Sequence, residues 1–197
     1  MDKLFFKYYN LYEHVHKKKN IMPKIIETTK DNVINIVKSL LDEGKYEELN
    51  CRKIAKMANI SLGTLYNFFP SKMEMLAIIL LDDWNIMINS IKKDVSFICG
   101  IKNVYEGVSK FSKKYYQFWE YSKTNFKEYI PYLSKRPLLT KQILSILKEI
   151  KDYNNLIIDN DILEFISETV LLYSTRLIEY NKIEKIFIKL IGGNNNG

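Results

Sequence analysis

The stretch ISLGTLYNFFPSK, residues 60–72, carries side chains suited to contacts with nucleic acid. Thr64 and Tyr66 supply hydroxyl groups that can donate to phosphate oxygens, and Asn67 offers the carboxamide that pairs with an adenine edge in the major groove. Gly63 has no side chain and lets a phosphate backbone or a base edge approach closely. The cationic side chains that flank this stretch are Arg52, Lys53, Lys56 and Lys72. The combination predicts binding to double-stranded DNA.

Little in the sequence favours catalysis. The only histidines are His14 and His16, so no Ser-His-Asp or Cys-His arrangement is evident. Cys51 and Cys99 form no CxxC pair, which argues against a zinc site or a disulfide framework. A glycine-rich phosphate loop is also missing from the sequence. We therefore expect a protein that is not an enzyme and that uses no cofactor and no metal.

Two helices are predicted before residues 60–72. The first begins at Thr29, carries apolar side chains on one face and stops at Gly44, a residue that takes a positive φ easily. The second runs from about Cys51 to Ala58, and Asn50 is its predicted N-cap. The residues of this second helix expected to face inward are Ile54 and Met57.

A tight turn is predicted after the second helix. Asn59 is the non-glycine residue type that best tolerates the left-handed backbone of such a turn. Ser61 is placed to cap a helix over 62–69, which we expect Leu65 and Phe69 to anchor in the core. Two helices joined in this way are typical of a helix-turn-helix, in which the later helix reads DNA.

A long helix is predicted to follow the recognition helix. Pro70 halts the recognition helix, and Ser71 with Glu74 three residues later forms a capping box. Lys72 and the free N–H groups at this helix start are suited to holding a phosphate. We expect the helix to continue to Val95 and to link the DNA-binding head to a larger body.

The segment CRKIAKMANISLGTLYNFFPSKMEMLAIIL, residues 51–80, resembles the DNA-binding signature of the tetracycline-repressor (TetR) family of one-component transcriptional regulators. The matching positions are Ile54-Ala55, Ala58, Ile60-Ser61, Gly63-Thr64-Leu65-Tyr66, Phe69 and Ser71-Lys72, with Gly44 before them. The resemblance covers about residues 29–80. It implies phosphate contacts by Thr64, Tyr66 and Lys72, and specificity at Leu62, Gly63, Asn67 and Arg52.

The chain also departs from the family pattern. Asn59 stands where glycine is usual, and Leu62 and Phe68 stand where the family more often has residues that form hydrogen bonds. Contact of Leu62 or Phe68 with a thymine methyl is therefore an open alternative. The DNA-binding residues predicted in all are Asn50, Arg52, Lys53, Lys56, Ser61, Leu62, Gly63, Thr64, Tyr66, Asn67, Phe68 and Lys72.

Helical periodicity runs through nearly the whole chain, and no stretch alternates as a half-buried strand does. The sequence therefore predicts an all-α protein. Further helices are expected over 104–119, 138–153, 162–180 and 183–191, with Asp159 or Asp161 capping the third of them. The predicted domains are an N-terminal extension or arm over 1–23, a helix-turn-helix domain over 24–70, a helical ligand-binding and dimerisation domain over 71–192 and a flexible tail over 193–197.

Aromatic side chains recur at helical spacing in the later part of the chain. Packing is the simpler explanation for each one, whereas a long apolar ligand tunnel is the alternative for the group, which the resemblance strengthens. The candidate ligand contacts are Trp84, Tyr105, Phe111, Tyr115, Phe118, Trp119, Phe126, Tyr129 and Tyr132. Lysines flank them at 110, 113, 114, 123 and 127. They form either a solvated face or a pocket mouth suited to a fatty acyl-coenzyme A.

The overall charge and the apolar runs narrow the functional classes. A net charge of +7 favours a polyanionic partner, and the run 75–81 is too short to cross a membrane, so we expect a cytoplasmic protein. The resemblance implies a homodimer through the C-terminal helices and a palindromic operator. We thus expect a ligand-responsive regulator, a repressor that a hydrophobic or amphipathic molecule releases from its operator. The alternatives are a regulator that responds to multiple drugs or aromatic metabolites, and a sequence-indifferent architectural DNA binder.

Overall fold

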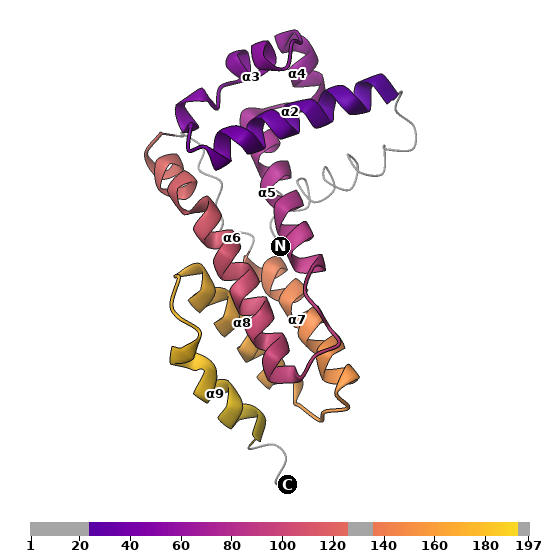
Figure 1. The fold of residues 1–197 in the computed structure, drawn as a ribbon, viewed down its shortest axis with the longest axis vertical. Helices are drawn as coiled ribbons and strands as arrows, with labels where there is room; N and C mark the ends of the chain where they lie inside the picture. The colour runs from indigo at the N-terminus through magenta and orange to yellow at the C-terminus, as the bar shows by residue number, and fades with distance from the viewer. Residues whose placement is uncertain (1–23, 126–135, 193–197) are drawn as a thin grey trace. The chain divides into compact units, whose positions relative to one another are not determined.

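The computed structural model describes residues 24–125 and 136–192 (Figure 1). Every regular element in this part of the chain is a helix, which confirms the all-α prediction there. The predicted N-terminal extension and the predicted tail lie outside the described residues. The elements are α2 (Lys24–Asp42), η2 (Tyr46–Glu48), α3 (Cys51–Met57), α4 (Leu62–Phe68), α5 (Lys72–Asn89), α6 (Phe97–Asn125), α7 (Arg136–Tyr153), α8 (Asn160–Thr175) and α9 (Asn181–Gly192).

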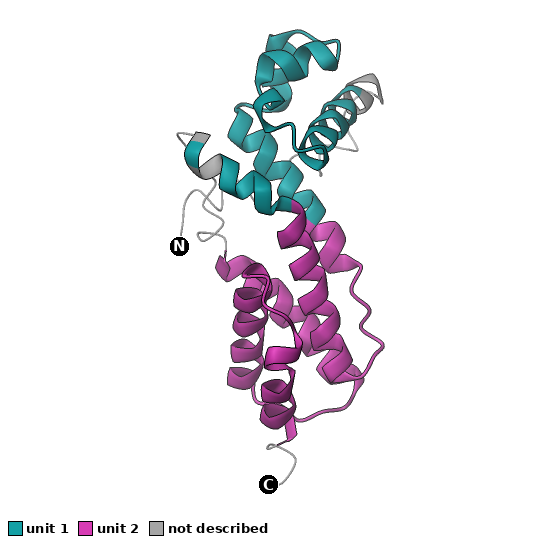
Figure 2. Ribbon diagram, turned by 60° about the vertical axis from the view of Figure 1, so that its left-hand side comes forward, with its two compact units in different colours: residues 1–83, 115–134 teal, residues 84–114, 135–197 magenta. Residues whose placement is uncertain are grey.

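The described residues divide into two compact units (Figure 2). Unit 1 contains 24–83 and 115–125, and unit 2 contains 84–114 and 136–192. Because the boundaries fall inside α5 and α6, each of these two helices contributes to both units. The predicted domain boundaries, drawn along the chain, stay a prediction.

The core of unit 1 is built from one face of each of its helices. α2 contacts α3, and α3 contacts α4. Each of α3 and α4 has seven residues, about two turns, which is too short to persist alone in water. Burial of an apolar face therefore has to hold both helices in place. The fully buried side chains include Val33, Val37, Leu49, Ile54, Leu65, Phe69, Met75 and Leu76.

The prediction that Met57 faces inward is wrong. Its side chain is 46% exposed, whereas Ile54, Ala55 and Ala58 are buried. At 100° per residue these three positions share one face of α3, and Met57 falls outside that arc. The spacing of Ile54 and Met57 alone does not show on which side of Ile54 the buried face of α3 continues.

Left-handed residues end four of the helices among the described residues. Gly44 ends α2 with φ +70°, and its neighbour Lys45 donates to the Leu40 carbonyl at 2.9 Å. Asn59 ends α3, Asn155 ends α7 and Leu177 ends α8 with the same pattern of hydrogen bonds. This pattern satisfies the last carbonyls of a helix. The roles predicted for Gly44 and Asn59 are confirmed.

Two predicted helices are shorter than expected. α5 ends at Asn89 rather than Val95, and the Ser90 hydroxyl donates to the Met87 carbonyl at 2.7 Å. Such local side-chain bonds compete with continuation of a helix. α8 ends at Thr175 rather than at residue 180, because Leu177 takes the left-handed conformation.

Unit 2 combines α7, α8 and α9 with the parts of α5 and α6 that belong to it. α7 contacts α8, the next helix in the sequence (Figure 1). Asp159 is the N-cap of α8 and accepts from the Asp161 N–H at 2.9 Å, which decides between the two predicted caps. The fully buried side chains include Ile143, Leu147, Ile150, Leu163, Ile166, Val170 and Phe187. In the described part of the chain, no helix is both long enough and apolar enough to cross a membrane.

Two substitutions in α3 test whether burial holds this short helix. Ile54→Ala is expected to lower the free energy of unfolding by about 2–5 kcal/mol, since it leaves a cavity in the core of unit 1. Met57→Ala, on the exposed side of the same helix, is the matched control and should change it by no more than about 0.5 kcal/mol. Urea denaturation followed by circular dichroism measures both. Equal losses for the two variants would contradict this assignment of faces.

Candidate nucleic-acid interface

Side-chain caps set where α3 and α4 begin. The Asn50 side chain accepts a hydrogen bond from the Lys53 N–H at 2.8 Å, and Ser61 Oγ accepts one from the Thr64 N–H at 2.9 Å. Both predicted caps are confirmed. The Ser61 and Thr64 hydroxyls are also 2.8 Å apart. Three of the predicted DNA-binding residues, Asn50, Ser61 and Thr64, thus have hydrogen-bond partners within the protein.

The turn between α3 and α4 is closed by backbone hydrogen bonds. Asn59, with φ +54°, donates to the Lys56 carbonyl at 3.1 Å, and Ile60 donates to the Ala55 carbonyl at 3.0 Å. These bonds satisfy the end of α3 and turn the chain directly into the cap of α4. The angle between the two helices therefore depends on local bonds.

The two sides of α4 have different roles. Leu65 on α4 and Phe69 just after it are almost fully buried, as predicted, and the Lys30 ammonium lies 5.7 Å from the centre of the Phe69 ring. Tyr66 is 45% exposed, and Gly63 and Asn67 are exposed beside it. The remaining predicted residues of this helix, Leu62, Thr64 and Phe68, are half-buried. Because Leu65 and Phe69 anchor one side of α4 in the core, the other side is available to a nucleic acid.

Gly63 is not required by packing within the chain. A Cβ atom built at this position would come no nearer than 3.7 Å to any neighbour, which in this case is Ser61 Oγ. A glycine in a helix is less stable than an alanine by up to about 1 kcal/mol. The glycine is therefore explained better by close approach of a partner than by the fold.

Cys51 on α3 interacts with Tyr66 on α4 and with Lys72 on α5. Electrostatic interaction with the Cys51 side chain, and then a hydrogen bond between the two side chains, raise the pKa of the Tyr66 phenol. The phenol thus stays protonated and able to donate. Partial burial lowers the pKa of the Lys72 ammonium, and the proximity of Cys51 opposes that shift.

The start of α3 is therefore close to Tyr66 and Lys72, two of the three predicted phosphate contacts. Sequence reasoning missed Cys51, because it considered the cysteines only as zinc ligands or disulfide partners. Its position directly before Arg52 at the first turn of the helix was the signal available. The structure brings Tyr66 and Lys72 to this one place.

Cations on α3 add positive charge to this surface. Arg52, Lys53 and Lys56 are all exposed. Lys53 forms an ion pair with Glu48 at 3.1 Å. Surface ion pairs of this kind are worth at most about 1 kcal/mol, so a phosphate can compete with Glu48 for the lysine.

The candidate ligand contacts are distributed over the two units. Trp84, Tyr105 and Phe111 are buried in unit 2, and Tyr115 and Phe118 are buried in unit 1. Trp119 is half-buried in unit 1, next to the Phe118 ring. The other three, Phe126, Tyr129 and Tyr132, lie outside the described residues.

The aromatic side chains of unit 2 have partners within that unit. The Trp84 and Phe111 rings meet edge to face at 5.4 Å, and the Trp84 indole donates to Gln142 at 2.7 Å. The Tyr105 hydroxyl donates to the Ile178 carbonyl at 2.6 Å, and burial raises the pKa of Tyr105 to about 12. These contacts agree with packing as the explanation for single residues. A ligand role for the group stays a prediction.

Unit 1 has the fold and the surface of a helix-turn-helix DNA-binding domain. A family model described as "Bacterial regulatory proteins, tetR family" matches residues 38–79, which begin in α2 and end in α5. Residues 38–79 thus carry the DNA-binding signature of the TetR family, as the sequence had indicated. Among described residues, no three or more His, Cys, Asp and Glu side chains are grouped so as to hold a metal ion.

A curated relative agrees with this assignment over a short segment. The chain is 36% identical over 44 residues to the HTH-type transcriptional repressor KstR of Rhodococcus jostii (strain RHA1). The segment makes up 22% of this chain and 21% of the relative. The chain thus matches about a fifth of the length of that protein.

Gly63→Ala tests whether a partner approaches the α4 backbone. Because the new methyl group meets no close neighbour, the free energy of unfolding should stay equal or rise by up to about 1 kcal/mol. Affinity for DNA should fall by about 1–3 kcal/mol, the usual cost of one disturbed base-pair contact. Thermal denaturation and fluorescence anisotropy measure the two quantities on one preparation. Unchanged DNA affinity would remove Gly63 from the interface.

Proposed function

We propose that this chain is a ligand-responsive, DNA-binding transcriptional regulator that acts as a homodimer on a palindromic operator. The observation that carries the proposal is the capped α3–turn–α4 unit, whose exposed side presents Gly63, Tyr66 and Asn67 and is flanked by cations. The match of residues 38–79 to the TetR family model supports the same conclusion. Repression that a small molecule relieves is the form of regulation that we propose.

The proposed DNA contacts divide into two kinds. Tyr66 and Lys72, which both interact with Cys51, position a phosphate, and Thr64 adds a further contact to the backbone. Asn67 reads a base edge, and Arg52 and Leu62 contribute to the choice of sequence. Asn50 and Ser61 act mainly by capping, since their side-chain oxygens already accept backbone N–H groups.

Exposed apolar side chains on the last helices support a homodimer. Phe165 on α8 is 55% exposed, and Ile186 and Ile188 on α9 are similarly exposed. Large apolar side chains that are exposed at a surface are available to an association interface. Other apolar residues of the same two helices, Ile166, Val170, Ile183 and Phe187, are buried within the chain.

A hydrophobic or amphipathic effector is our proposal for the ligand, with a fatty acyl-coenzyme A first. The aromatic side chains Trp84, Tyr105 and Phe111 supply apolar surface in unit 2, and Lys110 and Lys113 are exposed on the same segment of α6. An acyl chain suits the first group and an anionic head suits the second. Multiple drugs or aromatic metabolites are the second candidate class.

The proposed mechanism is negative coupling between effector and DNA. If effector binding favours a different separation of the two recognition helices in the dimer, each ligand must weaken the binding of the other by the same factor. α5 and α6 are the helices suited to carry this effect, because each contributes to both units.

Selection from a random duplex library, followed by anisotropy titration, tests the proposal. We expect enrichment of a palindrome and weaker binding of that palindrome in the presence of long-chain acyl-coenzyme A, by about 5–150-fold. A palindrome indifferent to the acyl compound would retain the regulator and remove this ligand. Salt-sensitive binding with no enriched sequence would instead favour the architectural DNA binder.

Tyr66→Phe and an Asn67 substitution separate positioning from base reading. Tyr66→Phe is expected to weaken binding to all duplexes alike by about 1.5–3 kcal/mol, because it removes a hydrogen bond to a charged phosphate. Asn67→Ala should change preference at one base pair per half-site by about 1–3 kcal/mol. Affinities for the selected duplex and for its single-base variants measure both effects. The reverse pattern would exchange the two assignments.

A further inference from the structure

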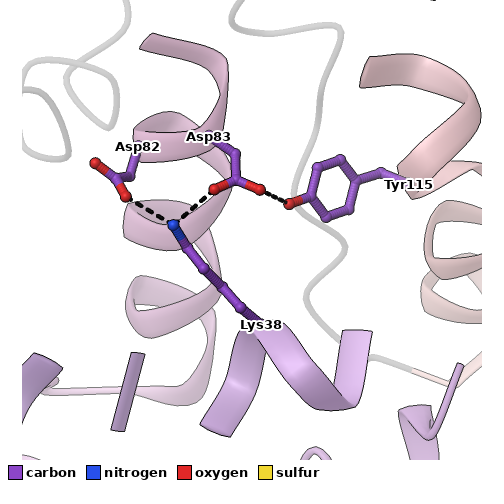
Figure 3. Close-up of polar contacts among 4 residues, drawn as sticks. All are labelled: Lys38, Asp82, Asp83 and Tyr115. Carbon is purple, nitrogen blue, oxygen red and sulfur yellow. Dashed lines mark hydrogen bonds and ion pairs between the residues drawn. The ribbon is translucent and has the colours of Figure 1, made fainter. Parts of the chain in front are cut away.

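One carboxylate in unit 1 bridges two helices that are distant in sequence. Lys38 on α2 has its ammonium 2.6 Å from Asp83 Oδ1 and 2.8 Å from Asp82 Oδ2, both on α5. Tyr115 on α6 donates its hydroxyl hydrogen to the other oxygen of Asp83 (Figure 3). Asp83 therefore connects α2, α5 and α6, whereas Asp82 joins only α2 to α5 through Lys38.

Because this network is largely buried, its charged and polar groups need partners within the protein. The Tyr115 side chain is almost fully buried, and the Asp83 side chain is 14% exposed. Burial first, and then the hydrogen bond to Asp83, raise the pKa of the Tyr115 phenol above its ordinary value, so that it stays neutral and donates. Burial lowers the pKa of Lys38, but the bonds and charges of the two aspartates outweigh burial and the net shift is upward. The lysine remains a cation between two anions.

We propose that Asp83 is a positioning residue for the helix-turn-helix. It holds Lys38 and Tyr115 at once, so the orientation of α2 is tied to the separation of α5 and α6 within unit 1. α2 contacts α3, and α3 contacts α4, so the orientation of α2 sets that of the recognition helix. This inference rests on the proposed function, because its readout is DNA binding.

The hydrogen bonds and ion pairs of this network are kept or lost together. If α6 moves away from α5, the Tyr115 hydroxyl loses its bond to Asp83 in a buried site. A buried charge or donor left without its partner is costly, so the arrangement is kept as a whole or given up as a whole. An element with two such arrangements converts a small shift in α5 or α6 into a reorientation of α2.

Asp83→Asn and Tyr115→Phe test the proposal, and Asp82→Asn is the matched control. Asp82 is the neighbouring carboxylate on the same lysine, but it is more exposed and has no bond to Tyr115 in Figure 3. The probes are duplexes with the half-sites selected by the wild-type protein, at the selected spacing and with one or two base pairs inserted between them. The quantity measured is the ratio of dissociation constants for altered and selected spacing. Hydrogen exchange of α2 and urea denaturation are followed on the same preparations.

We expect the wild-type protein and Asp82→Asn to keep the same spacing preference. Asp83→Asn and Tyr115→Phe should lower it by about tenfold, within the range that coupling between distant sites commonly spans. They should also speed hydrogen exchange in α2. Circular dichroism at 25 °C identifies any variant that fails to fold, and the Tyr115→Phe variant, which keeps the ring and removes only the hydroxyl, then carries the test.

Several results would overturn the proposal. Lower urea midpoints with an unchanged spacing preference would mean that the network only stabilises unit 1. Equal loss of preference in Asp82→Asn and Asp83→Asn would assign the effect to the charge around Lys38 rather than to the bridge to Tyr115. A wild-type protein that selects no paired half-sites would refute the proposed function, and this inference with it. That result is distinguishable because it needs no variant.

Discussion

The shortness of α3 and α4 is the constraint on which the rest of unit 1 depends. Helices of about two turns lose too much conformational entropy to form alone, so their ends and their inner faces must both be stabilised from outside. Asn50 and Ser61 cap the two starts, and Asn59 closes the turn between them. Leu65 and Phe69 then anchor α4 through burial. The exposed side of α4 therefore contributes little to the stability of the helix.

This division lets the exposed side of α4 vary without harm to the fold. Gly63 fills no space that the protein needs, and Asn67 is exposed. Because the fold does not depend on these two residues, their types can be set by recognition of a partner. Tyr66 and Lys72 are different, because the Cys51 side chain acts on both and ties them to the start of α3. The proposed phosphate contacts thus lie where three helices meet, whereas the proposed base contact of Asn67 does not depend on that junction.

The network around Asp83 adds a second kind of constraint. Partly buried ion pairs contribute little net stability, since desolvation offsets most of the attraction between the charges. What they do enforce is a particular arrangement, because each alternative leaves a charge or a hydroxyl without its partner. α2 is held to α5 by Lys38, and Tyr115 adds α6 to the same carboxylate. The ligand-responsive regulator that we propose has more use for such a selective contact than for additional apolar burial.

Local signals let the sequence alone determine the class of fold, the helix-turn-helix and its family. Asn50, Asn59, Ser61 and Ser71 act on backbone groups only a few residues away, so their types and spacing predicted their roles. Only the tertiary structure decided that Met57 is exposed, that Cys51 acts on Tyr66 and Lys72, and that Asp83 holds Lys38 and Tyr115. Lys38 is 44 residues from Asp82, and Tyr115 is 32 residues from Asp83. No local preference encodes such pairs, because they form only when packing of the apolar faces brings the helices together.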